Sequence, residues 1–239
     1  MSLVFVAPLV IGYEVGVLAL GPAAVRNGAE VWMRWLLDAA GFGQYFLLPM
    51  LICGLLLGWH YTRHEPWQIR YGILPGMWLE CVVLAVILLA VGKLQARVLG
   101  SPTSSSTALA WETLGGEMRQ TAARIVAYLG AGLYEEVLFR LILVSAIAAA
   151  LKSAGLNRRG CLIGSIAATS LLFAAAHYRF DFTLLGLHLT RTHGDPFTWF
   201  SFLFRVSAGA FFALLFAFRG FGIAAGTHAI YDLLLVLAA

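Results

Sequence analysis

Residues 71–92 read YGILPGMWLECVVLAVILLAVG, an apolar run in which Glu80 is the only charged side chain. About 20 consecutive apolar residues suffice for a helix to cross the hydrocarbon core of a bilayer, so this run predicts a transmembrane helix. Other apolar segments lie at residues 3–20, 45–59, 125–151, 161–177, 197–218 and 222–239. We therefore expect an all-α, polytopic transmembrane helix bundle with about seven spans, and the segment ends are compatible with six to eight.

The composition separates a membrane protein from the other broad classes. Apolar residues make up 61% of the 239 residues and charged residues 12%, whereas a soluble domain carries about 45–50% and about 25%. This balance excludes a soluble cytosolic enzyme and is the opposite of what a disordered chain requires. The net charge of +4 comes from a few scattered arginines, which argues against a nucleic-acid partner. We expect an integral, multi-pass protein of a bacterial cytoplasmic membrane, in contact with the lipid bilayer.

The polar sequence GSPTSSST at residues 100–107 is the clearest divider in the chain. We expect N-terminal transmembrane segments in residues 1–100, a flexible polar link in residues 101–115, and a second helix bundle in residues 116–239. Residues 31–40 mix aromatic, apolar and charged side chains. They predict either an amphipathic helix in the membrane interface or an extension of the following span.

Charged and polar residues inside the later apolar segments point to chemistry. An Asp, Lys or Arg at the bilayer centre costs about 2.5–3.5 kcal/mol on insertion scales, so such residues are interpreted as functional. We expect them to line a polar cavity within the bundle. They form three groups: Glu135, Glu136 and Arg140 in GLYEEVLFRLIL, Phe173 and His177 in SLLFAAAHY, and His228 and Asp232 in GTHAIYDLLL.

The spacing within these groups suggests which side chains meet. Residues four apart share a helix face, so Glu136 can form an ion pair with Arg140, and His228 projects together with Asp232. Glu135 lies about 100° around the helix from Glu136, so the two carboxylates face different neighbours. One acid can therefore be tethered while the other is free to act.

A free carboxylate beside imidazoles suits hydrolysis of a peptide bond by activated water. The carboxylate can act as the general base, and a nearby imidazole can share the proton and later protonate the leaving amine. The tetrahedral intermediate needs hydrogen-bond donors, which His228 and a neighbouring side chain can supply. The sequence has no Ser in a GxSxG context and no Cys beside a His, so it gives no local support for a covalent nucleophile.

The ordered motifs E-E-x-x-x-R, F-x-x-x-H and H-x-x-x-D resemble those of the CPBP family, the CAAX prenyl proteases and bacteriocin-processing proteins also called ABI proteins. The resemblance covers roughly residue 117 to the C-terminus. It implies a glutamic-type intramembrane endopeptidase and a catalytic helix bundle in residues 116–239. The implied substrates are membrane-associated proteins or peptides, possibly lipidated or membrane-anchored, that are cut near the C-terminus.

The resemblance also assigns roles by position. It implies that Glu135 is the general base on the water, helped by His177, and that His228 and Asp232 line the oxyanion site. Supporting positions fall on Glu136, Arg140 and Phe173. Asp232 departs from the commonest family pattern, which is H-x-x-x-N, and an ionised Asp cannot donate to an oxyanion. It would have to be protonated, or else orient His228 from behind.

Three alternatives stay open. We expect no cofactor, but Glu135, His177 and His228 also make an accepted catalytic zinc set, although no H-E-x-x-H motif is present. Acids and histidines in a bundle also form the proton relays of transporters, although no internal repeat is detectable. A non-catalytic membrane protein, such as an immunity factor or a scaffold, is the third alternative.

Four further polar residues fall outside these motifs. Glu14 and Glu80 lie in apolar segments, and we interpret them as interhelical hydrogen-bond partners. His60 and His64 are four residues apart in a charged loop, and we interpret them as interfacial residues rather than metal ligands.

Overall fold

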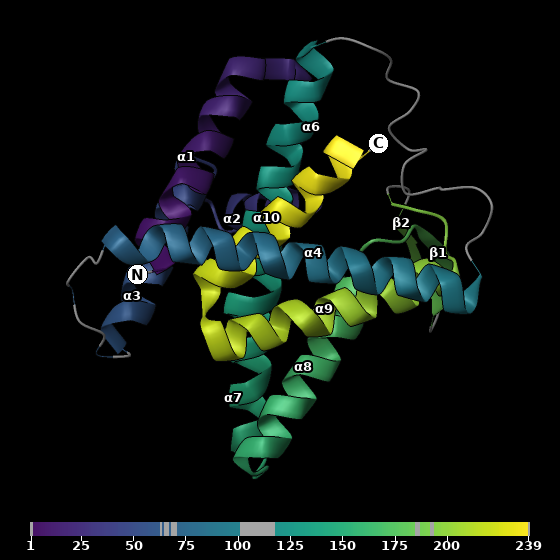
Figure 1. Cartoon of the computed structure of the whole chain (residues 1–239). Coiled ribbons are helices and arrows are strands. Elements are labelled where there is room, and N and C mark those ends of the chain that lie inside the picture. The colour runs from purple at the N-terminus through teal and green to yellow at the C-terminus, as the bar shows by residue number, and fades with distance from the viewer. Residues whose placement is uncertain are drawn as a thin grey trace.

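The computed structural model describes residues 2–62, 64, 67, 71–100, 118–184, 187–191 and 194–238, and this part of the chain is predominantly helical (Figure 1). The polar link expected at residues 101–115 lies outside the described residues. The N-terminal helices are α1 (Ser2–Leu20), α2 (Gly28–Ala39), α3 (Leu47–Thr62) and α4 (Leu74–Leu99). The later helices are α6 (Met118–Gly130), α7 (Ser145–Ser153), α8 (Arg158–Ala175), α9 (Trp199–Arg219) and α10 (Phe221–Ala238).

Among the described residues, three helices are long and apolar enough to cross a membrane: α1, Tyr71–Leu99, which contains α4, and α9. Shorter apolar helices lie at Leu47–Thr62 and Phe221–Val236. An apolar run forms a helix in lipid because the helix satisfies every backbone polar group internally. The prediction of an α-helical chain with several apolar helices is confirmed, whereas the number of spans and the polar cavity stay predictions.

Residues 31–39 belong to α2, a separate helix that begins at Gly28 and ends at Ala39, before α3. The prediction of a separate amphipathic helix is therefore confirmed, while its place in the membrane interface stays a prediction. The extension of the following span is wrong, because the chain turns at residues 40–46 and Gly41 has a φ of +85°. One face of α2 buries Glu30 and Met33, while Trp35 on the other face is 66% exposed.

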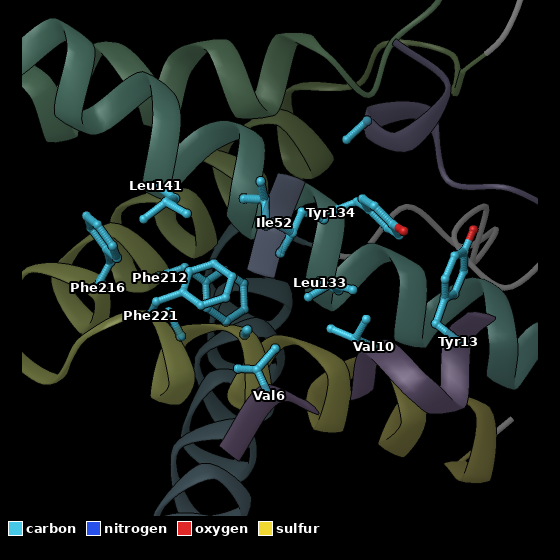
Figure 2. Packing of buried hydrophobic residues seen from close by; sticks show 14 of the residues in the cluster. Val6, Val10, Tyr13, Ile52, Leu133, Tyr134, Leu141, Phe212, Phe216 and Phe221 are labelled. Carbon is cyan, nitrogen blue, oxygen red and sulfur yellow. The ribbon is translucent and has the colours of Figure 1, made fainter. Parts of the chain in front are cut away.

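The longest helical rod runs from α6 into α7 through two π-helical segments, η3 (Ala131–Glu135) and η4 (Val137–Val144). The segment η3 crosses α10 at very short range, since a Cβ on Gly132 would lie 2.5 Å from the backbone nitrogen of Ala229. Figure 2 shows side chains of the hydrophobic core, to which η3 contributes Leu133 and Tyr134. It includes Val6, Val10, Tyr13, Leu133, Tyr134, Phe212 and Phe221.

A short antiparallel hairpin interrupts the helical pattern between α8 and α9. Strand β1 (Phe180–Leu184) pairs with β2 (Leu187–Arg191), and Phe180 lies opposite Arg191. At its base the backbone N–H of Asp195 donates a 2.9 Å hydrogen bond to the carbonyl of His177. The hairpin was not predicted from the sequence: β1 (FDFTL) and most of β2 (LHLTR) alternate apolar and polar residues, but each strand is only five residues long.

Candidate active site

Glu135 and Glu136 lie where the two π-helical segments meet, at the centre of the long rod. π-Helical turns are rare and are frequent at functional sites. The Glu136 side chain is completely buried, and the Glu135 side chain is 12% exposed. The two carboxylates share His228 but otherwise have different partners: Arg140 lies beside Glu136, and His177 lies beside Glu135.

The two carboxylate oxygens of Glu135 have different contacts. Its Oε1 accepts a 2.8 Å hydrogen bond from the side-chain amide of Asn27. Its Oε2 lies 3.8 Å from Nε2 of His177 and 4.0 Å from Nε2 of His228. Both distances exceed those of a direct hydrogen bond. Oε2 is buried and accepts no hydrogen bond from the part of the chain that the structure describes.

His177 follows the C-terminal end of α8, and its ring orientation is set by its own helix. Its Nδ1 lies 2.7 Å from the backbone carbonyl of Phe173, four residues earlier. A carbonyl oxygen only accepts, so Nδ1 carries the proton and Nε2 faces Glu135. The His177 side chain is 27% exposed, the most open of the site histidines and carboxylates.

His228 is more enclosed and contacts three acidic residues. Its Nδ1 lies 2.7 Å from Oε1 of Glu136 and donates to that carboxylate. Its ring stacks on Phe212, with centroids 4.4 Å apart and planes at 14°. Its Nε2 lies 3.6 Å from Oδ2 of Asp232 and faces Glu135. Glu136 therefore occupies the position behind the ring, and Asp232 lies on the Nε2 side.

Arg140 forms the ion pair with Glu136 that the i,i+4 spacing predicts, with Nη1 3.1 Å from Oε1. Its side chain is 1% exposed, and its Nη2 donates to the carbonyl of Gly209 at 3.2 Å. The guanidinium lies 4.4 Å from the ring centroid of Phe173 and 5.4 Å from that of Phe212. Arg140 thus connects the helical rod to α9 and packs against the rings of Phe173 and Phe212, which contact the histidines.

Asn27 is the site contact that the sequence analysis missed. It is the N-cap of α2, and its Oδ1 accepts a 2.8 Å hydrogen bond from the backbone N–H of Ala29. The sequence N-G-A-E at residues 27–30 carries the signal of an N-cap followed by an acid three residues later. No local signal connects it with Glu135, which lies 108 residues away.

A buried polar network lies beside the site, between α1, α2 and η3. Tyr134 donates a 2.6 Å hydrogen bond to Glu14. Glu30 is fully buried and accepts hydrogen bonds from Tyr13, Arg26 and Arg34. The interpretation of Glu14 as an interhelical partner is therefore confirmed.

The remaining polar residues of the sequence analysis lie elsewhere. Glu80 on α4 pairs with Arg219 at the end of α9 through two contacts of 2.6 Å, which confirms it as an interhelical partner. The His60 ring packs edge-on against Trp67 at 4.3 Å. Within the described ranges, no three His, Cys, Asp or Glu side chains are arranged as metal ligands.

Comparison with known proteins gives one match. A family model described as type II CAAX prenyl endopeptidase, Rce1-like, matches residues 118–234. Comparisons with curated proteins and with solved structures gave no match. The matched residues include every position of the three motifs, whereas Asn27 and helices α1 to α4 precede them.

Proposed function

Because the chain belongs to the Rce1-like family of type II CAAX prenyl endopeptidases, a family of proteases, we propose that it cleaves membrane-associated proteins near their C-terminus. The observation that carries this proposal is that Oε2 of Glu135 faces Nε2 of both His177 and His228. These side chains come from three separate parts of the bundle.

Glu135 is the general base. A water molecule bound to its Oε2 lies within hydrogen-bond reach of both imidazoles, because each Nε2 is about 4 Å away. Polar groups that lie more than about 3.5 Å apart can be bridged by a water molecule. Oε2 takes a proton from this water as the oxygen attacks the carbonyl carbon of the peptide bond.

His177 transfers the proton from Glu135 to the leaving amine. Its Nδ1–H is fixed on the Phe173 carbonyl, so Nε2 has its lone pair toward Glu135 and the water. It accepts the proton from the Glu135 side and delivers it to the amide nitrogen as the bond between carbon and nitrogen breaks. The products are a carboxylic acid and an amine, and Glu135 returns to its starting state.

His228 stabilises the tetrahedral intermediate. Its Nδ1–H donates to Glu136, and with Nε2 also protonated the ring donates to the oxyanion that forms on the substrate carbonyl. The stacking on Phe212 restricts the ring to one plane. Asp232, 3.6 Å from Nε2, contributes to this donor pair in its protonated form.

The substrate class is tested directly with purified protein in detergent. The probe is an internally quenched farnesylated peptide that ends in a CAAX sequence, compared with the same peptide lacking the farnesyl group. We expect cleavage by the native protein, loss of cleavage with Glu135→Gln, and retention with Glu80→Gln, which removes a carboxylate outside the site.

Profiling of protein C-termini in membrane fractions extends the test without a guess about the substrate. Cells that carry Glu135→Gln should accumulate proteins with extra C-terminal residues, and cells that carry Glu80→Gln should not. Identical profiles, together with no cleavage of either peptide, would reject the protease and favour the scaffold or the transporter.

A further inference from the structure

We propose that Asn27 is a positioning residue that orients the Glu135 carboxylate by binding one of its oxygens, so that the other oxygen faces the two histidines. The proposal rests on the function proposed above for Glu135. It assigns a role in the reaction to the segment before α2, which lies outside the residues matched by the family model.

The orientation of the Asn27 amide is determined by its own helix. Its Oδ1 caps α2 by accepting from the backbone N–H of Ala29 at 2.8 Å. Reversing the amide would place its NH₂ group against another donor, so the cap excludes that orientation. The Nδ2 group must therefore point toward Glu135, where it donates to Oε1 at 2.8 Å.

This contact fixes the orientation of the carboxylate plane. The terminal torsion of a glutamate is broad, so a carboxylate without a fixed partner can rotate away from the histidines. A donor on Oε1 leaves Oε2 as the oxygen between Nε2 of His177 and Nε2 of His228. Holding the base at the reacting water in advance contributes directly to the rate.

The position of Asn27 is itself secured by the buried network of α2. Glu30, one turn along the helix, is fully buried and binds Tyr13 of α1 as well as Arg26 and Arg34. Arg34 also donates to the carbonyl of Tyr45 at 2.8 Å. Three polar partners fix Glu30 in place. Asn27, which caps the same helix three residues earlier, is therefore held close to Glu135.

The decisive variant is Asn27→Asp. Aspartate keeps the N-cap acceptor, but it replaces the donor to Glu135 with a second carboxylate. The matched control is Asn157→Asp, since Asn157 caps α8 through a 2.8 Å contact with Gly160 and is exposed. Asn27→Gly is a second variant, because glycine at an N-cap costs only a few tenths of a kcal/mol relative to asparagine.

We expect Asn27→Asp to lower kcat on the farnesylated peptide about 10–100-fold, with KM within about three-fold, as for partners that orient a reacting group. The acid limb of its rate profile should move to higher pH, because a neighbouring carboxylate opposes ionisation of Glu135. Besides Asn27, the charged and titratable groups around Glu135 are His177, His228, Arg140 and Asp232. Asn27→Gly should lower kcat and Asn157→Asp should change neither kcat nor the profile.

A native kcat and pH profile in both Asn27 variants would overturn the proposal, and so would an equal loss in Asn157→Asp. Infrared titration of the Glu135 carboxyl band, assigned by its absence in Glu135→Gln, gives a readout that needs no turnover. The band should titrate at higher pH in Asn27→Asp than in the native protein. If no peptide is cleaved, the proposed function fails while this titration still decides the Asn27 contact.

Discussion

Gly132 lies so close to Ala229 that a Cβ at position 132 would meet the Ala229 backbone nitrogen at 2.5 Å and its Cα at 2.7 Å. The two residues sit directly beside the site, because Gly132 precedes Glu135 by three positions and Ala229 follows His228. This crossing therefore sets the separation between Glu135 and His228.

The first prediction is that Gly132→Ala lowers both stability and activity. The new methyl group meets backbone rather than a movable side chain, so the helices must separate, at a cost of at least about 1–3 kcal/mol. A displacement of about 1 Å at the base can reduce the rate about 100-fold. Thermal unfolding in detergent and cleavage of the farnesylated peptide measure the two effects.

Gly54→Ala is the matched control, because Gly54 lies within α3 and a Cβ there has no atom within 4 Å in the described structure. Alanine is favoured over glycine in a helix by about 0.5–1 kcal/mol, so this variant should be neutral or slightly more stable. Equal stability and equal activity of Gly132→Ala and Gly54→Ala would show that the crossing does not set the distance between Glu135 and His228.

The second prediction compares two ion pairs that differ in burial. Arg140→Gln leaves the buried Glu136 without its arginine partner, and removal of one partner of a buried pair costs about 3–5 kcal/mol. Arg219→Gln removes the partner of Glu80 at a site where the arginine is 55% exposed, which costs about 0–1 kcal/mol. The unfolding temperatures of the two variants give the comparison. An Arg140→Gln variant that unfolds at the native temperature would show that the ion pair with Glu136 does not stabilise the fold.

The sequence predicted the parts of this molecule that have a local signature. Runs of apolar residues identified the helices, and i,i+4 spacing identified the pair of Glu136 with Arg140. The ordered motifs identified Glu135, His177 and His228, which the structure brings together from separate segments.

Other features depend on contacts between distant residues and have no such signature. Asn27 reaches Glu135 across 108 residues, and its own sequence indicates only a helix cap. The placement of Asp232 beside Nε2 of His228, with Glu136 behind the ring, follows from how α10 packs on the rod. The π-helical turns around Glu135 likewise carry no pattern in the sequence.

The third prediction concerns metal. Donors that share a tetrahedral zinc at about 2.0–2.1 Å lie roughly 3.3 Å apart, whereas Oε2 of Glu135 lies 3.8 and 4.0 Å from the two Nε2 atoms. We therefore expect 1,10-phenanthroline to leave cleavage of the farnesylated peptide unchanged. The Nδ1 atoms of His177 and His228 are hydrogen-bonded, as they are in many zinc-bound histidines. Chelation therefore distinguishes the metal-free enzyme from the zinc-dependent one. Loss of activity that added zinc restores would establish the zinc-dependent enzyme instead.

The fourth prediction concerns Asp232, whose Oδ2 lies 3.6 Å from Nε2 of His228. An ionised aspartate only accepts hydrogen bonds, whereas an asparagine amide also donates. Asp232→Asn should therefore keep or raise kcat, because the amide can donate to the oxyanion at any pH. Asp232→Leu should lower kcat about 100–1000-fold, the usual effect of removing an oxyanion donor.

The pH dependence separates the two roles that Asp232 can have. If the protonated acid is the donor, the native rate falls as pH rises through the ionisation of Asp232, and Asp232→Asn removes that decline. Asp38→Asn, at the end of α2, is the control and should leave the profile unchanged. An Asp232→Asn variant as inactive as Asp232→Leu would show that the negative charge beside His228, rather than a donor, is what the reaction requires.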